Sequence, residues 1–419
     1  MICRTCRGGR RAGAGLLARL VNLAPRRRLD RPRTLTLRTA FPVGSSAPHY
    51  AIDHFEKQPR YALEGSPALI DAPGEGRWTA AIWCIEPREG ETPDSLDATV
   101  PRLRQLVEIA PGADGAAPAD IRFEGIAFAH CRWDTLTEGY ASGQATKHDR
   151  RDGSGKGGQT FIPAAVRVAG ASKIAFQNCR FAHLGGSGVW IGQGASDCRI
   201  DGGAFADISG NAINIGEQGT ENVARNIAVD GATVAGCGAQ FFGSVGIWIG
   251  MAEGCAVERC EIRDLPYTGV SVGWRWDPTP SPCRGHRIAG NHIHHVMQVL
   301  SDGGGIYTLG RQPGTVLANN HIHDVPLNAG RAQSNGIFMD EGTTDLTVEG
   351  NLIHAIAKSP IRFHKAGENS IRRNTLGVGE GATAFTYNNT DPDRIRFEAN
   401  RELPEGAPEL SNAADAWAP

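Results

Sequence analysis

Two acidic residues in the second half of the chain stand next to glycine-bounded apolar segments. Asp302 precedes three consecutive glycines, Gly303–Gly305, and Asp340 ends the segment that begins at Gly336. Glycine is unfavourable inside a strand, so a run of three indicates that the backbone approaches a ligand closely or bends to aim Asp302. Two carboxyl groups brought together are suited to acid/base chemistry at a glycosidic bond. Asp302 and Asp340 are therefore the first candidates for catalysis.

Aromatic side chains recur near these acids and predict a sugar-binding surface. On the glycine-bounded segments Ile and Val occupy alternate positions, so the residues between them are expected to face solvent. In chain order this outward row reads Trp190, Asn214, Trp248, Ser271, Tyr307, Phe338 and Arg362. Sugar rings stack on aromatic faces while their hydroxyls reach polar groups, and Trp274 and Trp276 crowd the same end. An aromatic ladder that only stiffens the sheet is the structural alternative.

Histidine, arginine and glutamate complete the set of candidate substrate contacts. His364 and Arg362 fall on the outward rows near Asp340, and Glu341 follows that acid directly. Histidines also recur one repeat apart, at His294, His323 and His354. This spacing indicates a structural stack, with His294 retained as a sugar contact. The candidate substrate-binding residues are thus Trp248, Trp274, Trp276, Tyr307, Glu341, His294, His364 and Arg362. The spacing of histidines and acids does not suggest a metal site, so we predict no metal and no cofactor.

A repeat of 23 to 31 residues must position these side chains. Its marker column is Cys179, Gly203, Ala232, Cys260, Asn291, Asn320, Asn351 and Asn374. Apolar residues stand three positions before and two positions after each marker. One such unit cannot bury its apolar side alone, so neighbouring units must stack. The pattern predicts an all-β parallel β-helix, in which Asn291, Asn320 and Asn351 form a ladder of side-chain amides.

Composition and charge agree with one large solenoid. Of 419 residues, 54 are glycine and 21% are charged, which is typical of many tight turns and few long helices. The formal net charge of −2 does not favour a nucleic-acid partner. No apolar stretch approaches the roughly 20 residues needed to cross a bilayer, so no membrane partner is expected. We expect a monomer that binds an oligo- or polysaccharide.

The ends of the chain differ from the repeat region. Residues 1–40 hold eleven arginines and a single acid, Asp30. Arg19 interrupts the short apolar run that precedes it, and no clean small-residue cleavage site follows, so the segment is not a clear signal peptide. We expect a disordered basic leader over residues 1–50, an irregular N-terminal cap with the first coil over 51–120, the β-helix over 121–400 and a C-terminal tail over 401–419.

Several segments resemble the core of glycoside hydrolase family 141. The similarity rests on Ser301–Gly310, Asn319–Val325, Gly336–Gly342 and Ser271–Trp276, and it extends from about Ile121 to Thr375. Members of that family are right-handed parallel β-helices, so the resemblance implies a right-handed single-stranded parallel β-helix here. It also implies α-L-fucosidase or xylanase activity in plant cell-wall breakdown, with Asp302 and Asp340 as the catalytic pair. A secreted or periplasmic location is expected from the same resemblance.

The alignment of the two acidic segments poses a geometric problem. Matching Ile306 with Ile337 places Asp340 seven residues beyond Asp302, which is about 23 Å along straight strands. A glycosidase needs its two carboxyl groups roughly 5–9.5 Å apart. The pair can meet only if Gly303–Gly305 folds Asp302 back over the groove, which glycine permits. Which carboxyl group is the acid stays open at this point.

Two other functions fit the same scaffold. β-Helices host several chemistries, and Arg362 and Lys365 could neutralise a carboxylate in a polysaccharide lyase or uronate epimerase. A non-catalytic carbohydrate-binding solenoid would use the aromatic row without needing the two aspartates.

Overall fold

The computed structural model describes residues 73–74, 76–79, 82–92, 94–133, 144–149, 159–328, 330 and 332–417. These residues fall into two compact units. The described part of the first unit contains an antiparallel hairpin of β1 (Gly76–Thr79) and β2 (Ile82–Ile85). The second unit, residues 102–134, 142–148 and 159–419, contains the repeats. The expected basic leader over residues 1–50 lies outside the described residues.

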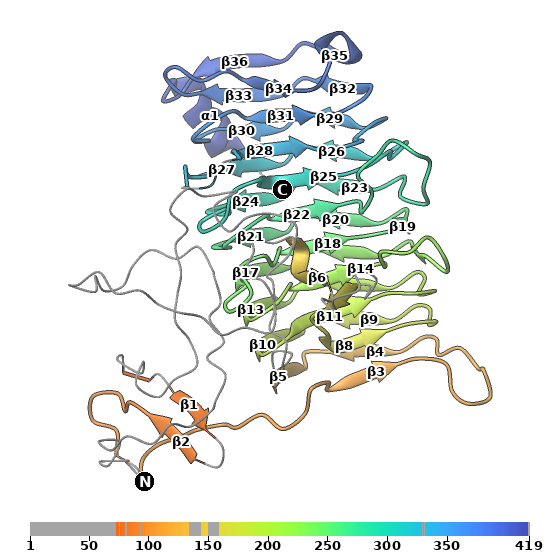
Figure 1. The fold of residues 1–419 in the computed structure, drawn as a ribbon, viewed down its shortest axis with the longest axis vertical. Helices are drawn as coiled ribbons and strands as arrows, with labels where there is room; N and C mark the ends of the chain where they lie inside the picture. Colours follow the sequence, from red (N-terminus) through yellow and green to blue (C-terminus); the bar gives the residue numbers. More distant parts are fainter. Residues whose placement is uncertain are drawn as a thin grey trace. The chain divides into compact units, whose positions relative to one another are not determined.

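Three parallel sheets of ten strands each form the second unit (Figure 1). Sheet 1 contains β3 (Val107–Ile109), β8 (Ala164–Val168), β11 (Ser187–Ile191), β14 (Ile213–Ile215), β18 (Ile247–Ile249), β22 (Val270–Val272), β25 (Gly303–Thr308), β28 (Ser334–Met339), β31 (Ile361–His364) and β34 (Phe385–Asn388). Sheet 2 contains β4 (Arg122–Glu124), β9 (Ala175–Gln177), β12 (Arg199–Asp201), β16 (Ala228–Asp230), β20 (Ala256–Glu258), β23 (Arg287–Ala289), β26 (Val316–Ala318), β29 (Thr347–Glu349), β32 (Asn369–Arg372) and β35 (Ile395–Glu398). Sheet 3 contains β5 (Ala127–Cys131), β10 (Arg180–Leu184), β13 (Ala204–Ile208), β17 (Thr233–Cys237), β21 (Glu261–Arg263), β24 (His292–His294), β27 (His321–His323), β30 (Leu352–Ile353), β33 (Thr375–Val378) and β36 (Arg401–Pro404).

The remaining elements are short. Two further strand pairs are β15 (Ala224–Arg225) with β19 (Ala252–Glu253) and β6 (Lys147–Asp149) with β7 (Gln159–Phe161). Single 3-10 turns are η2 (Gln144–Thr146) and η3 (Pro392–Arg394), and the chain closes with α1 (Pro408–Ala416). Within the described residues no helix is both long and apolar enough to span a membrane.

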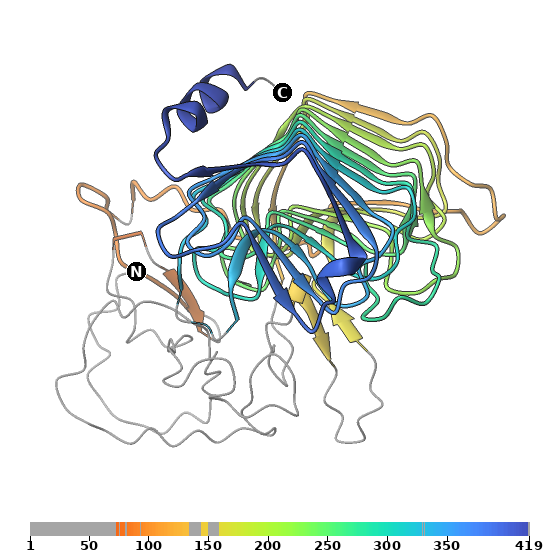
Figure 2. The same ribbon diagram turned by 90° about the horizontal axis from the view of Figure 1, so that it is seen from above.

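Successive coils superimpose when the molecule is viewed along the stack, so the three sheets enclose one continuous core (Figure 2). The apolar positions of the repeat fill this core: Phe176 pairs with Ile200 and Ile200 with Val229 in sheet 2. Phenylalanines of sheet 3 stack between coils, with ring centroids of Phe181 and Phe205 4.5 Å apart. Stacking supplies the burial that no coil could reach alone. The predicted parallel β-helix is confirmed.

The asparagine ladder is also confirmed and extends further than expected. The side-chain Nδ2 of Asn291 donates to Oδ1 of Asn320, and that of Asn320 donates to Oδ1 of Asn351, each over 2.9 Å. Asn374 and Asn400 continue the chain of amides. The Oδ1 of Asn320 also accepts from the backbone N–H of Asn291, so the ladder satisfies buried main-chain groups as well as itself.

The outward row of sheet 1 has the predicted register but not the predicted exposure. Trp248 pairs with Ser271, and Tyr307 with Phe338, as the repeat requires. Yet every member of the row is buried, and Trp248 and Phe338 have no exposed surface. The expectation of a solvent-facing aromatic floor is wrong because other parts of the chain cover it. At Asn214 the cover includes η2, where the carbonyl oxygen of Ala145 accepts from the neighbouring Asn211 Nδ2.

Candidate active site

The geometry of Asp302 is set by its own backbone, not by the glycines beside it. Strands β25 and β28 align Ile306 with Ile337, as expected, and residues 303–308 form a regular strand. None of Gly303–Gly305 has a positive φ, whereas Asp302 has a φ of 66°. The expectation that the glycines fold the chain back is therefore wrong: the left-handed turn is made by Asp302 itself, at a residue type that tolerates it.

The three glycines have a packing role instead. A Cβ atom at Gly303 would lie 2.4 Å from Oγ1 of Thr268, and one at Gly305 would lie 2.5 Å from Cγ2 of Ile322. Both distances are shorter than real Cβ contacts. The three glycines therefore let β25 pack closely against neighbouring side chains inside the coil. Asp302 directly precedes this strand.

Asp302 lies in a crowded environment and is partly exposed. Its backbone oxygen accepts a 2.6 Å hydrogen bond from the Tyr267 hydroxyl, and its Oδ1 lies 3.7 Å from Nη1 of Arg362. The side chain keeps 43% of its surface exposed, so water and a ligand can reach it. Desolvation by the surrounding protein raises the pKa of Asp302 to about 6, and the charge of Asp340 acts in the same direction while Arg362 opposes both. The carboxyl group can therefore hold a proton in mildly acidic solution.

Asp340 is held in place by two side chains. Its Oδ2 accepts a 2.5 Å hydrogen bond from the Tyr307 hydroxyl, and its Oδ1 lies 2.6 Å from Nδ1 of His364. Only 10% of the side-chain surface is exposed. Burial, with the nearby charge of Asp340, raises the pKa of Tyr307, so the phenol stays protonated and acts as the donor. The two acids thus occupy unlike environments within one site.

Arg362 lies beside Asp302 and offers a donor nitrogen without a hydrogen bond in the described part of the chain. Its guanidinium carbon lies 4.2 Å from the centroid of the Phe338 ring, and its Nε donates to Oδ1 of Asn388 over 3.0 Å. Its Nη1 is buried without a hydrogen-bond partner among the described residues. A buried guanidinium nitrogen without a hydrogen bond is suited to donate one to an oxygen of a bound ligand.

Glu341 is near the pair but is already engaged. Its Oε1 accepts a 2.8 Å hydrogen bond from the ammonium group of Lys365. Asp340, Glu341 and His364 each offer an oxygen or nitrogen within 4.8 Å of the others, so this corner could hold a cation. The prediction that the site needs no metal stays a prediction.

The remaining predicted contacts divide into accessible and inaccessible ones. Trp248 and Trp274 are buried against each other with ring centroids 5.5 Å apart, so neither can stack on a sugar. Trp276, packed on Trp274, is 41% exposed and remains available. Tyr307 is buried and bonds Asp340, so its role is to position the acid, not to stack on a sugar.

His294 is not part of the site. It lies on β24 of sheet 3, where its Nε2 is 2.7 Å from Oε1 of Glu261, and its ring stacks on that of His323 at 4.9 Å. The structural stack predicted from the spacing is confirmed, and the retained role of His294 as a sugar contact is wrong.

Sequence reasoning missed Tyr267 and Asn388. Tyr267 orients the backbone of Asp302 and Asn388 orients Arg362, but both interactions cross between coils through loop or edge positions. The repeat register could have indicated Asn388, since it pairs with His364 in sheet 1. Tyr267 stands outside the strands and carries no such signal.

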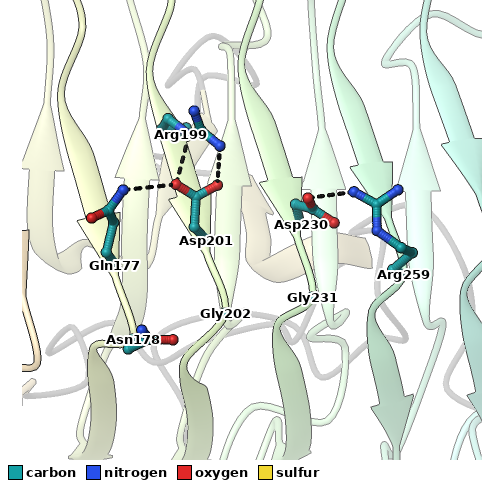
Figure 3. Close-up of a pocket in the computed structure, with 8 residues that line it drawn as sticks. All are labelled: Gln177, Asn178, Arg199, Asp201, Gly202, Asp230, Gly231 and Arg259. Carbon is teal, nitrogen blue, oxygen red and sulfur yellow. Dashed lines mark hydrogen bonds and ion pairs between the residues drawn. The ribbon is translucent and has the colours of Figure 1, made fainter.

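A shallow recess of about 550 Å³ lies elsewhere, on sheet 2 (Figure 3). Its charged side chains neutralise one another, since Arg199 pairs with Asp201 and Arg259 with Asp230. The first pair lies on β12, and the second joins β16 to the residue that follows β20. Because its acids are engaged by arginines and it lies on a different sheet from Asp302 and Asp340, it is not the candidate active site.

Comparison with solved structures gives similarities of different extent. A glycoside hydrolase structure superposes with a TM-score of 0.59 at 21% identity, over 86% of this chain and 63% of that chain. The chain thus spans less than two thirds of the hydrolase, and at this identity the likeness concerns the fold alone. The DFA-IIIase of Arthrobacter chlorophenolicus A6 in complex with GF2 gives a TM-score of 0.38 at 14% identity, over 57% of this chain and 60% of that chain. The A-module of the Azotobacter vinelandii mannuronan C-5 epimerase AlgE6 gives 0.35 at 16% identity, over 57% and 55%.

Sequence comparison gives the family. No curated protein matches the chain. The family model described as a right handed beta helix region matches residues 162–273 and 230–401, which together cover more than half of the chain. The matched residues are those that form most of the three parallel sheets. The chain therefore belongs to the right-handed β-helix family.

Proposed function

We propose that this protein is a glycoside hydrolase in which Asp302 is the general acid and Asp340 is the nucleophile or base. The observation that carries the proposal is that two carboxyl groups from adjacent coils lie in unlike environments, with the charge of Asp340 acting on Asp302. Asp302 is partly exposed with a pKa raised to about 6, whereas Asp340 is buried and accepts hydrogen bonds from fixed donors. Such a difference between neighbouring carboxyl groups is how glycosidases divide the two roles.

The substrate class rests on the resemblance to glycoside hydrolase family 141. We propose a plant cell-wall-type glycan, cleaved with α-L-fucosidase or xylanase specificity. Exposed Trp276 offers a stacking surface, and Arg362, Glu341 and His364 stand beside the acids as groups for sugar hydroxyls. Carbohydrate-active proteins among the structures that share the fold agree with a saccharide substrate.

The test is hydrolysis of aryl fucosides and xylosides, xylan and pectin fragments, with detection of new reducing ends. Asp302→Asn and Asp340→Asn should each abolish turnover while circular dichroism and the melting temperature show an intact fold. Asp201→Asn, a carboxylate on sheet 2 paired with Arg199, is the matched control and should retain activity. Full activity in both site variants would end the assignment, and binding without turnover in the wild type would identify a carbohydrate-binding solenoid.

A polysaccharide lyase or uronate epimerase is the second candidate, favoured by Nη1 of Arg362, which makes no hydrogen bond within the described residues. A uronate carboxylate would accept from that nitrogen, which lowers the barrier to removal of the adjacent C–H proton. A lyase would be recognised by ultraviolet absorbance of an unsaturated product without uptake of water. An epimerase would change the uronate composition without releasing reducing ends.

A further inference from the structure

The outer face of sheet 3 carries a dense array of histidines that the proposed hydrolase chemistry does not use. The array consists of His292, His294, His295, His321, His323 and His354. Strands β24 and β27 align His292 with His321 and His294 with His323, while the isoleucine between them points into the core. The rings therefore form two adjacent columns on one surface, with the ring centroids of His292 and His323 5.0 Å apart.

Two carboxylates fix which nitrogen carries hydrogen in the central rings. Oε2 of Glu261 lies 2.8 Å from Nδ1 of His292, and Oδ2 of Asp324 lies 2.7 Å from Nδ1 of His323. An ionised carboxylate only accepts, so each Nδ1 must be the donor. A neutral imidazole protonated at Nδ1 presents its lone pair at Nε2. These carboxylates therefore leave both rings with a free Nε2 lone pair.

The two lone pairs point at one another. Nε2 of His292 and Nε2 of His323 are 2.7 Å apart, a distance at which two acceptors repel unless a positive charge lies between them. A shared proton is one such charge. A metal cation is the other.

A third histidine completes a ligand set. Ring nitrogens of His292, His321 and His323 all lie within 4.8 Å of one another, and His321 is almost fully buried. Nε2 of His354 lies 2.9 Å from Nε2 of His321, so a fourth imidazole is close to the set. Zinc bonds to imidazole nitrogen at about 2.0–2.1 Å, which puts tetrahedral ligands about 3.3 Å apart. Movement of the rings by a few tenths of an ångström to about an ångström would therefore seat the ion.

We propose that His292, His321 and His323 bind a divalent transition metal of the zinc type, oriented by the carboxylates of Glu261 and Asp324. Donation from a ligating histidine to a carboxylate is the arrangement by which proteins fix imidazole ligands on such metals. Imidazole ligands select zinc, copper or nickel over calcium or magnesium. The fourth position falls to His354 or to water. The site is on a different sheet from Asp302 and Asp340, so the proposal does not depend on the proposed hydrolase activity.

Trp417 at the end of α1 supplies an internal reporter. Its ring centroid lies 5.5 Å from that of His292 and 5.4 Å from that of His321, and its indole N–H donates to the backbone oxygen of Asn319 over 3.0 Å. Cu²⁺ bound at the array would quench the fluorescence of this tryptophan. The quenched component should be missing in Trp417→Phe, which keeps all the ligands.

The direct test is calorimetric titration of the full-length, chelator-treated protein with Zn²⁺, with Ca²⁺ as the comparison. We expect one zinc ion per chain and no comparable binding of calcium. His323→Gln should abolish the stoichiometric site. Asp324→Asn keeps every ligand and should weaken zinc binding by about 10- to 100-fold. His183→Gln is the matched control, because His183 also pairs with a carboxylate, Asp207, over 2.7 Å. Its ring stacks on that of His130, and in the described part of the chain it makes no nitrogen-to-nitrogen contact with another imidazole.

Three outcomes would overturn the proposal. Zinc bound equally by the wild type and His323→Gln would show only adventitious surface binding. Absence of stoichiometric zinc binding would identify the facing nitrogens as a proton-sharing pair. Equal losses in Asp324→Asn and His183→Gln would show that the carboxylate beside His323 has no specific role. Melting curves of all variants separate loss of ligands from loss of fold.

Discussion

The pKa of Asp302 makes the proposed hydrolase testable through Arg362→Met. The guanidinium Nη1 lies 3.7 Å from Oδ1 of Asp302 and favours the charged carboxylate, so its removal must raise the pKa. Two unit charges at that distance interact by about 1.1 kcal/mol in water and about 4.5 kcal/mol at a protein-like dielectric. Because 43% of the Asp302 side chain is exposed, the screened value applies. It corresponds to about 0.8 pKa units.

The consequence appears in the pH dependence of kcat/KM. A general acid works only when protonated, so the wild-type rate should fall about tenfold per pH unit above the pKa of about 6. In Arg362→Met this basic limb should move to about pH 7. Carboxyl carbon-13 resonances, assigned by the signal lost in Asp302→Asn, measure the same shift without turnover. Arg259→Met removes a distant cation that pairs with Asp230 and should leave the limb in place. A limb that stays at pH 6 or moves lower in Arg362→Met would refute the reasoning.

Three further perturbations have defined outcomes. Tyr307→Phe removes a 2.5 Å hydrogen bond to Asp340. This change should lower kcat by roughly 10- to 100-fold with little change in melting temperature. An unchanged kcat would mean that Asp340 does not need this hydrogen bond for its position. Asn320→Ala, in the buried ladder, should cost about 2–4 kcal/mol of unfolding free energy in urea titrations. Asn412→Ala, at an exposed position of α1, should cost little, and equal effects would contradict a structural ladder. In the wild type the raised pKa of Asp302 gives stability that is present at low pH and lost as pH rises through about 6, so Asp302→Asn should melt higher than the wild type at pH 8 but not at pH 4.

The architecture was predictable because apolar residues recur periodically in the sequence. Strand pairs such as Ile306 with Ile337 follow directly from aligning the repeats, and so do the contacts between Asn291 and Asn320 and between His294 and His323. These contacts depend only on the register of neighbouring coils. Any side chain that occupies the same place in successive repeats must meet its counterpart about one strand spacing away.

The sites were less predictable because they depend on non-periodic parts of the chain. Alternation correctly placed Tyr307 outside the main core, but it contains no information on what covers that residue, and Trp248 is part of the core. The φ of 66° at Asp302 could not be predicted, because the three glycines that follow were the more obvious places for a turn. Likewise, the facing nitrogens of His292 and His323 arise from a diagonal contact between columns, which a comparison of equivalent positions does not reveal.

The coils differ in length, and this difference separates the surface that can contact a ligand from the strand register that positions the two aspartates. Strand register is kept from coil to coil, and the differences in length fall in the connecting corners. The corner between Val272 of β22 and Arg287 of β23 is long and carries the exposed Trp276, whereas Asp302 and Asp340 adjoin the ladder itself. Under the proposed function, insertions and deletions at such corners can reshape ligand choice while the two aspartates stay in register. Exchange of corners between related solenoids is therefore a practical route to new specificities on this frame.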